Sequence, residues 1–321
     1  MAMTSTQLLR DPGQPPQSPS LATLLCGVAA DPMGRLGLAC ALICLGMFVH
    51  IFRDNLGHFY YAWTTDENYS HGFLVPLISL YFANRVASRG MIAIEGGKWL
   101  GTVMLVVSLA LRLVTIPLPI PFLSDVAFLI GLTGLFTMMT GAAALKRYWF
   151  AFFFLVFMVP LPIALYSKIA SPLQLFASRV ASTLMTATGL PVLCEGNKMT
   201  LPGGLQMFVA EACSGMRQLT GFLALTAAVA YWTKGPPWYR VVIVISALPI
   251  ALSANIARVM LTGYIMHFVN PQFALGTYHT VEGLLMMAFG LLLLQAECWV
   301  LDQICQMKLP RPPVRSLAVG S

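Results

Sequence analysis

The stretch VAFLIGLTGLFTMMTGAAAL (Val126–Leu145) decides the fold class, because it runs for twenty residues without a charged side chain. A helix rises about 1.5 Å per residue, so twenty residues cover the ~30 Å hydrocarbon core of a bilayer. In lipid, every backbone N–H and C=O must be paired within its own helix or within a closed barrel. Barrel strands alternate apolar and polar residues. This stretch does not alternate, and it therefore predicts a transmembrane helix.

Similar apolar runs recur along the 321 residues, and the overall composition agrees with them. Hydrophobic residues make up 58% of the chain and charged residues 10%, whereas soluble globular domains carry about 25% charged residues. We therefore predict an all-α, polytopic transmembrane helix bundle with about eight spans. The expected spans are about 35–53, 72–84, 99–117, 125–144, 149–166, 215–233, 240–260 and 279–301.

The net charge of +7 indicates topology rather than nucleic-acid binding, because the basic residues are scattered and form no stripe with interleaved aromatic residues. With a cytoplasmic amino terminus, twelve of the 19 Lys and Arg residues fall in inner segments, four in outer segments and three in spans. Inner loops rich in Lys and Arg are typical of inner-membrane proteins. We expect both termini to be cytoplasmic.

The regions outside the core are short. Residues 1–34, rich in Pro, Ser and Gln, read as a disordered cytoplasmic tail without a cleavable signal peptide. Residues 35–301 form the expected transmembrane core, and 302–321 a second cytoplasmic tail. The longest outer connection is 167–212. It predicts an amphipathic helix over 173–188, a break at Gly189-Leu190-Pro191, and a small hairpin over 192–209 that could cover a bound substrate.

The seven cysteines predict neither a disulfide framework nor a metal site, since no pair has Cys-x-x-Cys spacing. We expect no metal and no cofactor. Five cysteines lie in or beside apolar runs and read as small hydrophobic residues. Cys194 is expected on the outer side, where a disulfide to Cys213 would remove that thiol from any chemistry.

Polar residues inside spans are costly and indicate function, and three stretches supply them at one predicted depth. Glu211-Ala212-Cys213-Ser214-Gly215-Met216-Arg217 starts the sixth span, Asn255-Ile256-Ala257-Arg258-Val259 ends the seventh, and Tyr278-His279 starts the eighth. Because these spans alternate in direction, Cys213, Arg258 and His279 all fall at the outer surface. Each alone has an ordinary explanation, as packing, snorkelling or headgroup contact.

Together these three residue types suit acyl transfer. A thiol at a helix amino terminus beside a cation has a lowered pKa, so Cys213 could attack a peptide carbonyl. His279 could protonate the leaving amine and later activate the incoming nucleophile. Arg258 could stabilise the oxyanion or hold a substrate carboxylate.

The same stretches resemble the signature regions of the exosortase/archaeosortase family over about residues 35–301. Asn68-Tyr69-Ser70-His71-Gly72-Phe73 resembles the family's amino-terminal bacterial signature, and Pro160-Leu161-Pro162 also matches its usual pattern. The resemblance implies a membrane-embedded cysteine transpeptidase in the bacterial inner membrane, with Cys213, Arg258 and His279 as its catalytic residues. Here only about 20 residues follow the last span, whereas some relatives carry an extra carboxy-terminal domain.

The implied partners are secreted proteins that end in a sorting signal: a short motif such as Pro-Glu-Pro, a transmembrane helix and a basic tail. The enzyme would cleave near the motif and pass the new carboxyl end to an unknown acceptor nucleophile, in a context of exopolysaccharide and extracellular matrix. Further residues expected to bind substrate or support the site are Glu211, Ser214, Arg217, Asn255 and His71. His71 could equally cap a helix.

Two other classes of function remain open from the residues alone. A transporter or export subunit for polysaccharide would use the intramembrane Arg and His to line a pathway, and it predicts internal repeats, of which we find no convincing example. A non-catalytic membrane scaffold would explain the hydrophobicity but not the shared depth of the polar residues.

Overall fold

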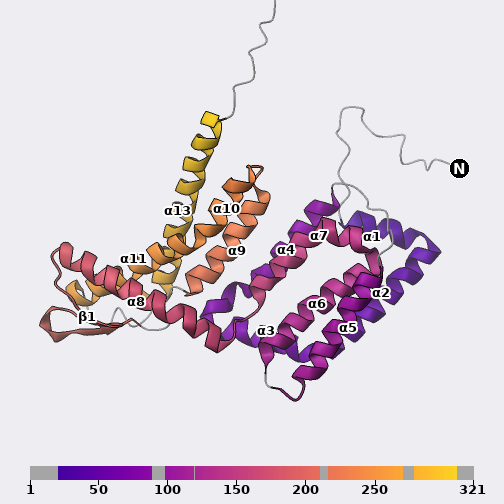
Figure 1. Ribbon diagram of the computed structural model, residues 1–321, viewed down its shortest axis with the longest axis horizontal. Helices are drawn as coiled ribbons and strands as arrows, with labels where there is room; N and C mark the ends of the chain where they lie inside the picture. The colour runs from indigo at the N-terminus through magenta and orange to yellow at the C-terminus, as the bar shows by residue number, and fades with distance from the viewer. Residues whose placement is uncertain (1–20, 89–97, 119, 210–215, 270–277, 309–321) are drawn as a thin grey trace, which may run out of the picture. The chain divides into compact units, whose positions relative to one another are not determined.

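The computed structural model describes residues 21–88, 98–118, 120–209, 216–269 and 278–308. It confirms the all-α class: apart from one small sheet, the elements are helices (Figure 1). Contacts within the chain define two compact units. The first comprises 1–65 and 71–160, and the second comprises 161–321 together with the short segment Asp66–Ser70. Five residues from the first half of the chain therefore belong to the second unit.

The first unit is a bundle of helices whose ends follow local rules. Asp31 accepts a hydrogen bond from the Gly34 amide and Pro32 follows it, which is a typical helix start. Gly141, with φ of 93°, separates two helices because this backbone conformation suits glycine. The helices are α1 (Leu21–Ala30), α2 (Pro32–Ile51), α3 (Arg53–Thr65), α4 (Leu74–Ala87), α5 (Lys98–Thr115), α6 (Pro121–Thr140) and α7 (Ala142–Phe154), with the short 3-10 turn η3 (Leu155–Met158). Another 3-10 turn, η2 (Glu67–Phe73), belongs to the second unit up to Ser70 and to the first unit from His71.

Helices α5 and α6 pack backbone to backbone. A Cβ atom built on Gly101 of α5 would lie 2.1 Å from the Met138 amide nitrogen of α6, so only glycine fits there. Farther along the same interface, the Ser108 hydroxyl donates a hydrogen bond of 2.6 Å to the Ala127 carbonyl. Small residues at a helix interface let the two backbones approach closely. In lipid, where hydrophobic burial does not drive association, such packing and hydrogen bonds stabilise the helix pair.

The second unit is arranged around α11, which contacts α8, α9 and α13. An antiparallel sheet in the order β1-β2-β3 follows α8, with Cys194 opposite Met199 and Met199 opposite Met207. The elements are α8 (Ile163–Ala187), β1 (Leu193–Glu195), β2 (Lys198–Thr200), η4 (Pro202–Gly204), β3 (Gln206–Phe208), α9 (Met216–Trp232), α10 (Pro237–Ile245), α11 (Ala247–Phe268) and α13 (Tyr278–Lys308).

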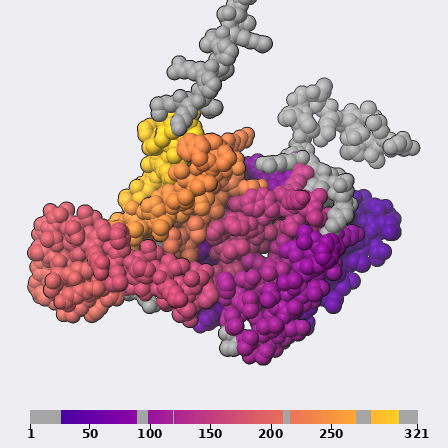
Figure 2. Space-filling view, viewed as in Figure 1, coloured from indigo at the N-terminus to yellow at the C-terminus, as the bar shows by residue number. Residues whose placement is uncertain are grey.

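The small sheet packs on α8 and α11 through buried methionines. Met185, Met199 and Met207 share one apolar cluster with Val259 of α11. Gln174 of α8 donates a hydrogen bond to the Val209 carbonyl just after β3. The space-filling view shows α8 and the sheet as one continuous mass (Figure 2). The predicted helix, break and hairpin after residue 172 are thus present, although the helix begins earlier and the hairpin has a third strand.

The protein is a multi-pass membrane protein. Five described stretches are long and apolar enough to cross a bilayer, or six if Ala142–Met158 and Ile163–Ala187 are counted as one broken span. The five are Pro32–Ile51, Lys98–Thr115, Pro121–Thr140, Pro237–Phe268 and Gly283–Cys305. The expected second and sixth spans appear as α4 and α9, with 14 and 17 described helical residues. Of these, α4 is shorter than the roughly 17–25 residues of a full crossing.

Several predicted boundaries differ from the structure for local reasons. The span expected at 149–166 is not one continuous helix, because the helical run stops at Met158 and Pro160-Leu161-Pro162 precedes a new helix. Residues 21–30, expected in the disordered tail, form α1, and α3 lies where an outer loop was expected. At the carboxy-terminal end, α13 continues to Lys308, beyond the predicted end of the core at residue 301.

Candidate functional site

Arg258 lies in the interior of the second unit. It sits in the middle of α11 and its exposed fraction is 0%, as is that of Asn255 one turn earlier on the same face. The chain therefore keeps a large cation where burial is expensive unless partners compensate it. For both polar atoms of the Asn255 amide, no hydrogen-bond partner is found among the described residues.

Arg217 is the second cation of this region, in the first turn of α9. It forms an ion pair with Glu67, and the charge of Asp66 also acts on it. Arg258 is close enough for the two positive charges to repel each other. Two carboxylates from one short segment therefore balance one of two neighbouring arginines.

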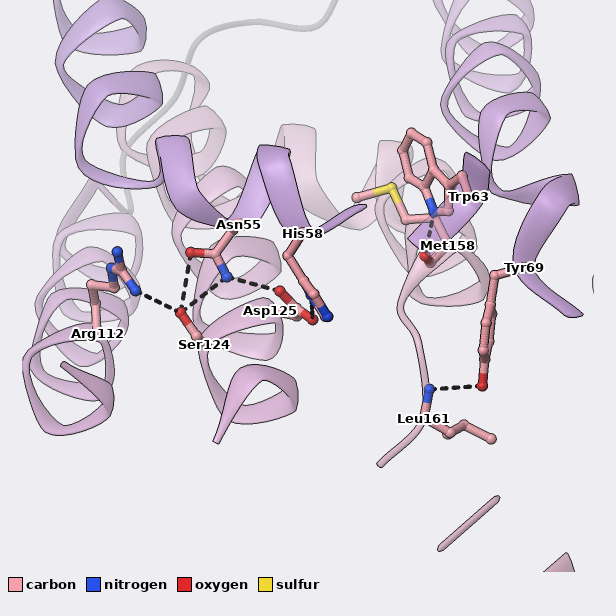
Figure 3. Close-up of polar contacts among 9 residues, drawn as sticks. All are labelled: Asn55, His58, Trp63, Tyr69, Arg112, Ser124, Asp125, Met158 and Leu161. Carbon is pink, nitrogen blue, oxygen red and sulfur yellow. Dashed lines mark hydrogen bonds and ion pairs between the residues drawn. The ribbon is translucent and has the colours of Figure 1, made fainter. Parts of the chain in front are cut away.

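The segment that supplies these carboxylates is fixed to the second unit by two further contacts. The Thr220 hydroxyl of α9 lies 3.2 Å from the Asn68 carbonyl. The Tyr69 hydroxyl accepts a hydrogen bond of 2.9 Å from the Leu161 amide (Figure 3). Tyr69 is buried, and burial raises the pKa of its phenol, which keeps the hydroxyl neutral. Asp66–Ser70 is thereby anchored beside the start of α9.

His71, the next residue, belongs to the first unit. Its Nε2 lies 3.2 Å from the Phe157 carbonyl in η3, so Nε2 carries a proton and donates it. Nearby, the Trp63 indole donates to the Met158 carbonyl at 3.0 Å (Figure 3). The His71 contact connects the end of η2 to η3. This is a structural role, and it agrees with the alternative that His71 caps a helix.

The start of α13 lies next to Arg217. A Cβ atom built on Gly283 would stand 3.6 Å from Arg217 Nη1, which is ordinary contact distance. His279 is four residues earlier, and positions four apart lie on the same helix face. The first turn of α9 and the second turn of α13 thus meet at Arg217 and Gly283. The side chain of His279 is outside the described part of the structure.

Three predicted site residues, Glu211, Cys213 and Ser214, also lie outside the described residues. Cys213 precedes the first residue of α9 by three positions in the sequence. The alternative of a disulfide at Cys194 is not realised, because that thiol is free and donates to the Gly196 carbonyl at 3.4 Å. Within the described residues, no group of three or more His, Cys, Asp or Glu side chains could hold a metal.

Asp66 and Glu67 are not among the site residues predicted from the sequence. The sequence does show two adjacent acidic residues before the Asn68-Tyr69-Ser70-His71 stretch. Nothing in the sequence, however, relates them to Arg217 rather than to the other basic residues. Asp66 and Glu67 lie near Arg217 because the segment Asp66–Ser70 belongs to the second unit.

Comparison with known proteins gives one family. Residues 63–296 match the family model described as transmembrane exosortase, which covers both the Asp66–Ser70 segment and the starts of α9 and α13. No curated protein and no solved structure matches the chain.

Proposed function

The chain belongs to the transmembrane exosortase family, and from this premise we propose that it is a membrane-embedded cysteine peptidase or transpeptidase. Its substrates are exported proteins with a carboxy-terminal sorting signal, whose transmembrane helix reaches the site through the bilayer. One observation supports the proposal above the others. The buried cation Arg258, the first turn of α9 and the second turn of α13 are neighbours within one compact unit.

Each of these elements carries one proposed catalytic residue. Cys213 precedes α9, Arg258 lies within α11, and His279 is the second residue of α13. The Cys213 thiolate attacks the carbonyl carbon of the scissile peptide, and Arg258 stabilises the negative charge on the oxygen. The C–N bond breaks as His279 gives its proton to the leaving amine, which leaves a thioester on Cys213.

The second half of the reaction transfers the acyl group. An acceptor nucleophile, or water in simple hydrolysis, loses a proton to His279 and attacks the thioester. The C–S bond breaks and Cys213 leaves as thiolate. The carboxyl end of the exported protein is then joined to the acceptor, and the enzyme returns to its starting state.

Arg217 and Arg258 have different roles in this proposal. Two arginines close together repel each other and would compete for the same anion. Glu67 and Asp66 balance Arg217, and we assign the oxyanion to Arg258. Glu67 is a positioning residue here. To Asn255, buried one turn from Arg258, we assign a role in holding the substrate.

The distribution of Lys and Arg supports a bacterial inner-membrane location with both termini in the cytoplasm and the site on the outer face. The sheet of residues 193–208 would then cover the site from outside. A cell-envelope setting linked to exopolysaccharide and matrix assembly follows from the same assignment.

Replacement of Cys213 tests the proposal directly. In cells that express the enzyme with a reporter ending in a Pro-Glu-Pro-type sorting signal, Cys213→Ala and Cys213→Ser should abolish processing while both variants accumulate in the membrane. Cys194→Ala, which removes the half-buried free thiol of β1, is the matched control and should process normally. Normal processing by Cys213→Ala would refute the nucleophile and, with it, the proposed mechanism.

A further inference from the structure

A second polar network lies in the first unit, away from every residue used above. The fully buried carboxylate of Asp125, in α6, accepts a hydrogen bond of 2.8 Å from the Asn55 amide and contacts His58 Nδ1 at 3.0 Å. Arg112 of α5 donates to the Ser124 hydroxyl at 3.1 Å (Figure 3). Buried ionisable groups in a membrane protein are costly, so a network of them indicates a function.

The pairing fixes the protonation of the histidine ring. An ionised carboxylate only accepts hydrogen bonds, so Asp125 requires the proton on His58 Nδ1. In the neutral ring, Nε2 then carries the lone pair and is a hydrogen-bond acceptor. No contact of Nε2 with another polar atom is found among the described residues, and the His58 side chain is 35% exposed. The network thus presents one oriented basic nitrogen.

Two familiar functions do not fit this network. Ser124 Oγ donates to Asn55 Oδ1 at 3.1 Å and accepts from Arg112, so its hydroxyl is not directed at His58 as a nucleophile would be. A metal site is also unsuited, since no group of three or more metal-binding side chains is found in the described chain.

A cavity of about 380 Å³ lies against the network. Its lining includes the polar side chains of His58, Arg112 and Asp54 and the apolar side chains of Ile116, Leu118 and Ile120. This volume lies at the small end of the ~300–1,000 Å³ range of small-molecule sites. The cavity therefore offers both hydrogen-bonding groups and apolar surface.

The polar side chains in the cavity already have partners. Arg112 Nη2 and Asp54 Oδ2 form an ion pair at 2.7 Å, and the Asp125 carboxylate is hydrogen-bonded by the Asn55 amide and His58 Nδ1. A strongly charged ligand would have to break one of these pairs. A neutral ligand with several hydroxyl groups can instead donate to His58 Nε2, accept from the outer donors of Arg112, and lay its C–H face on the apolar surface.

We propose that this cavity binds a neutral molecule with neighbouring hydroxyl groups, and that the ligand donates a hydrogen bond to His58. The ligand is either a free polyol or the hydroxyl-bearing headgroup of a neutral lipid, since both offer the same chemistry. Binding is independent of Cys213.

Site-resolved histidine modification tests this on the whole protein in phosphatidylcholine nanodiscs. Diethyl pyrocarbonate acylates neutral imidazole, and peptide mass spectrometry reads each histidine separately. His267, half-buried in α11 of the other unit, is the internal control. With glucose as probe at ten times its Kd, modification of His58 should slow about tenfold while that of His267 is unchanged.

A second experiment distinguishes a free polyol from a lipid headgroup as the ligand. Nanodiscs with a glucosyl diacylglycerol and no free sugar should protect His58 if a lipid headgroup is the ligand. Arg112→Lys should weaken protection, whereas Arg85→Lys, on the exposed side of α4, should not. Cys213→Ala should keep it, which separates this proposal from the peptidase. A His58 that reacts equally with and without both probes, or does not react at all, would overturn the proposal.

Discussion

Glu67 forms an ion pair with Arg217 across the chain, from η2 in the amino-terminal half to the first turn of α9. The Asp66–Ser70 segment that carries Glu67 belongs to the unit of its partner and not to that of its sequence neighbours. An acidic pair beside a signature stretch is thereby connected to the helix that begins just after Cys213.

Glu67→Gln should reduce processing about tenfold or more with little loss of stability. The Glu67 side chain is 64% exposed, and an ion pair of this kind contributes about 1 kcal/mol or less to folding. A small displacement of catalytic groups, however, can cost up to about a hundredfold in rate. Processing and thermal unfolding in detergent should be measured together. Glu195→Gln, on exposed β1, is the matched control.

The exchange Glu67→Arg with Arg217→Glu separates pairing from general charge. If Glu67 positions Arg217, the double variant should recover part of the rate that each single variant loses. Both single variants at wild-type rate would contradict the positioning role while leaving the Cys213 mechanism intact.

Arg258→Lys should be severely impaired although the charge is kept. The planar guanidinium offers several directed donors, whereas lysine offers a point charge. Loss of one such transition-state donor costs about a hundred- to a thousandfold in rate. Processing rates should be compared with those of Arg179→Lys, an exposed position on α8. An Arg258→Lys enzyme within about threefold of wild type would show that the charge alone is sufficient and would refute the directed-donor role of Arg258.

Asn255→Leu should uncouple stability from activity. The amide is fully buried and unmatched among the described residues, and replacing such a group by an apolar one of similar shape is nearly neutral or stabilising. We therefore expect an unchanged or higher unfolding temperature together with a large loss of processing. A less stable variant that still processes its substrate would argue for a packing role.

Cys213, Arg258 and His279 should face one cavity that opens sideways towards lipid, because the proposed substrate arrives as a transmembrane helix. In a variant whose other native cysteines are replaced, Cys213 and His279→Cys should be joined by a thiol cross-linker spanning about 10 Å, since near-attack geometry needs contacts of about 3.5 Å. Phe289→Cys, later in α13, is the control. No cross-link from position 279 would place Cys213 away from its partner.

Gly101→Ala should destabilise the first unit by about 1–3 kcal/mol, because the added methyl group meets backbone of α6 and the helices must separate. Gly46→Ala in α2 meets nothing within 4 Å and should be neutral or slightly stabilising through its better helix propensity. Thermal unfolding of both variants in the same detergent measures the difference. Equal stability of the two variants would show that the α5–α6 interface accommodates the added methyl group without loss of stability.

The sequence alone determined the class of protein and most of its helices, because the bilayer acts on each segment separately. The apolar run Val126–Leu145 must pair its backbone within helices in lipid, and α6 covers the run up to Thr140, after which Gly141 separates it from α7. Turn residues act equally locally, as Gly189 does with φ of 97° after α8. The signature stretches also indicated the family, which the family model confirms.

Only the tertiary structure decided which polar groups meet. Glu67 and Arg217, or His58 and Asp125, share no periodicity, and ion pairs between distant segments depend on packing that hydropathy does not encode. The break at Pro160-Leu161-Pro162 and the transfer of Asp66–Ser70 into the second unit are decisions of the same kind. Membrane insertion selects apolar surface segment by segment, whereas polar pairing is selected by the free energy of the assembled bundle.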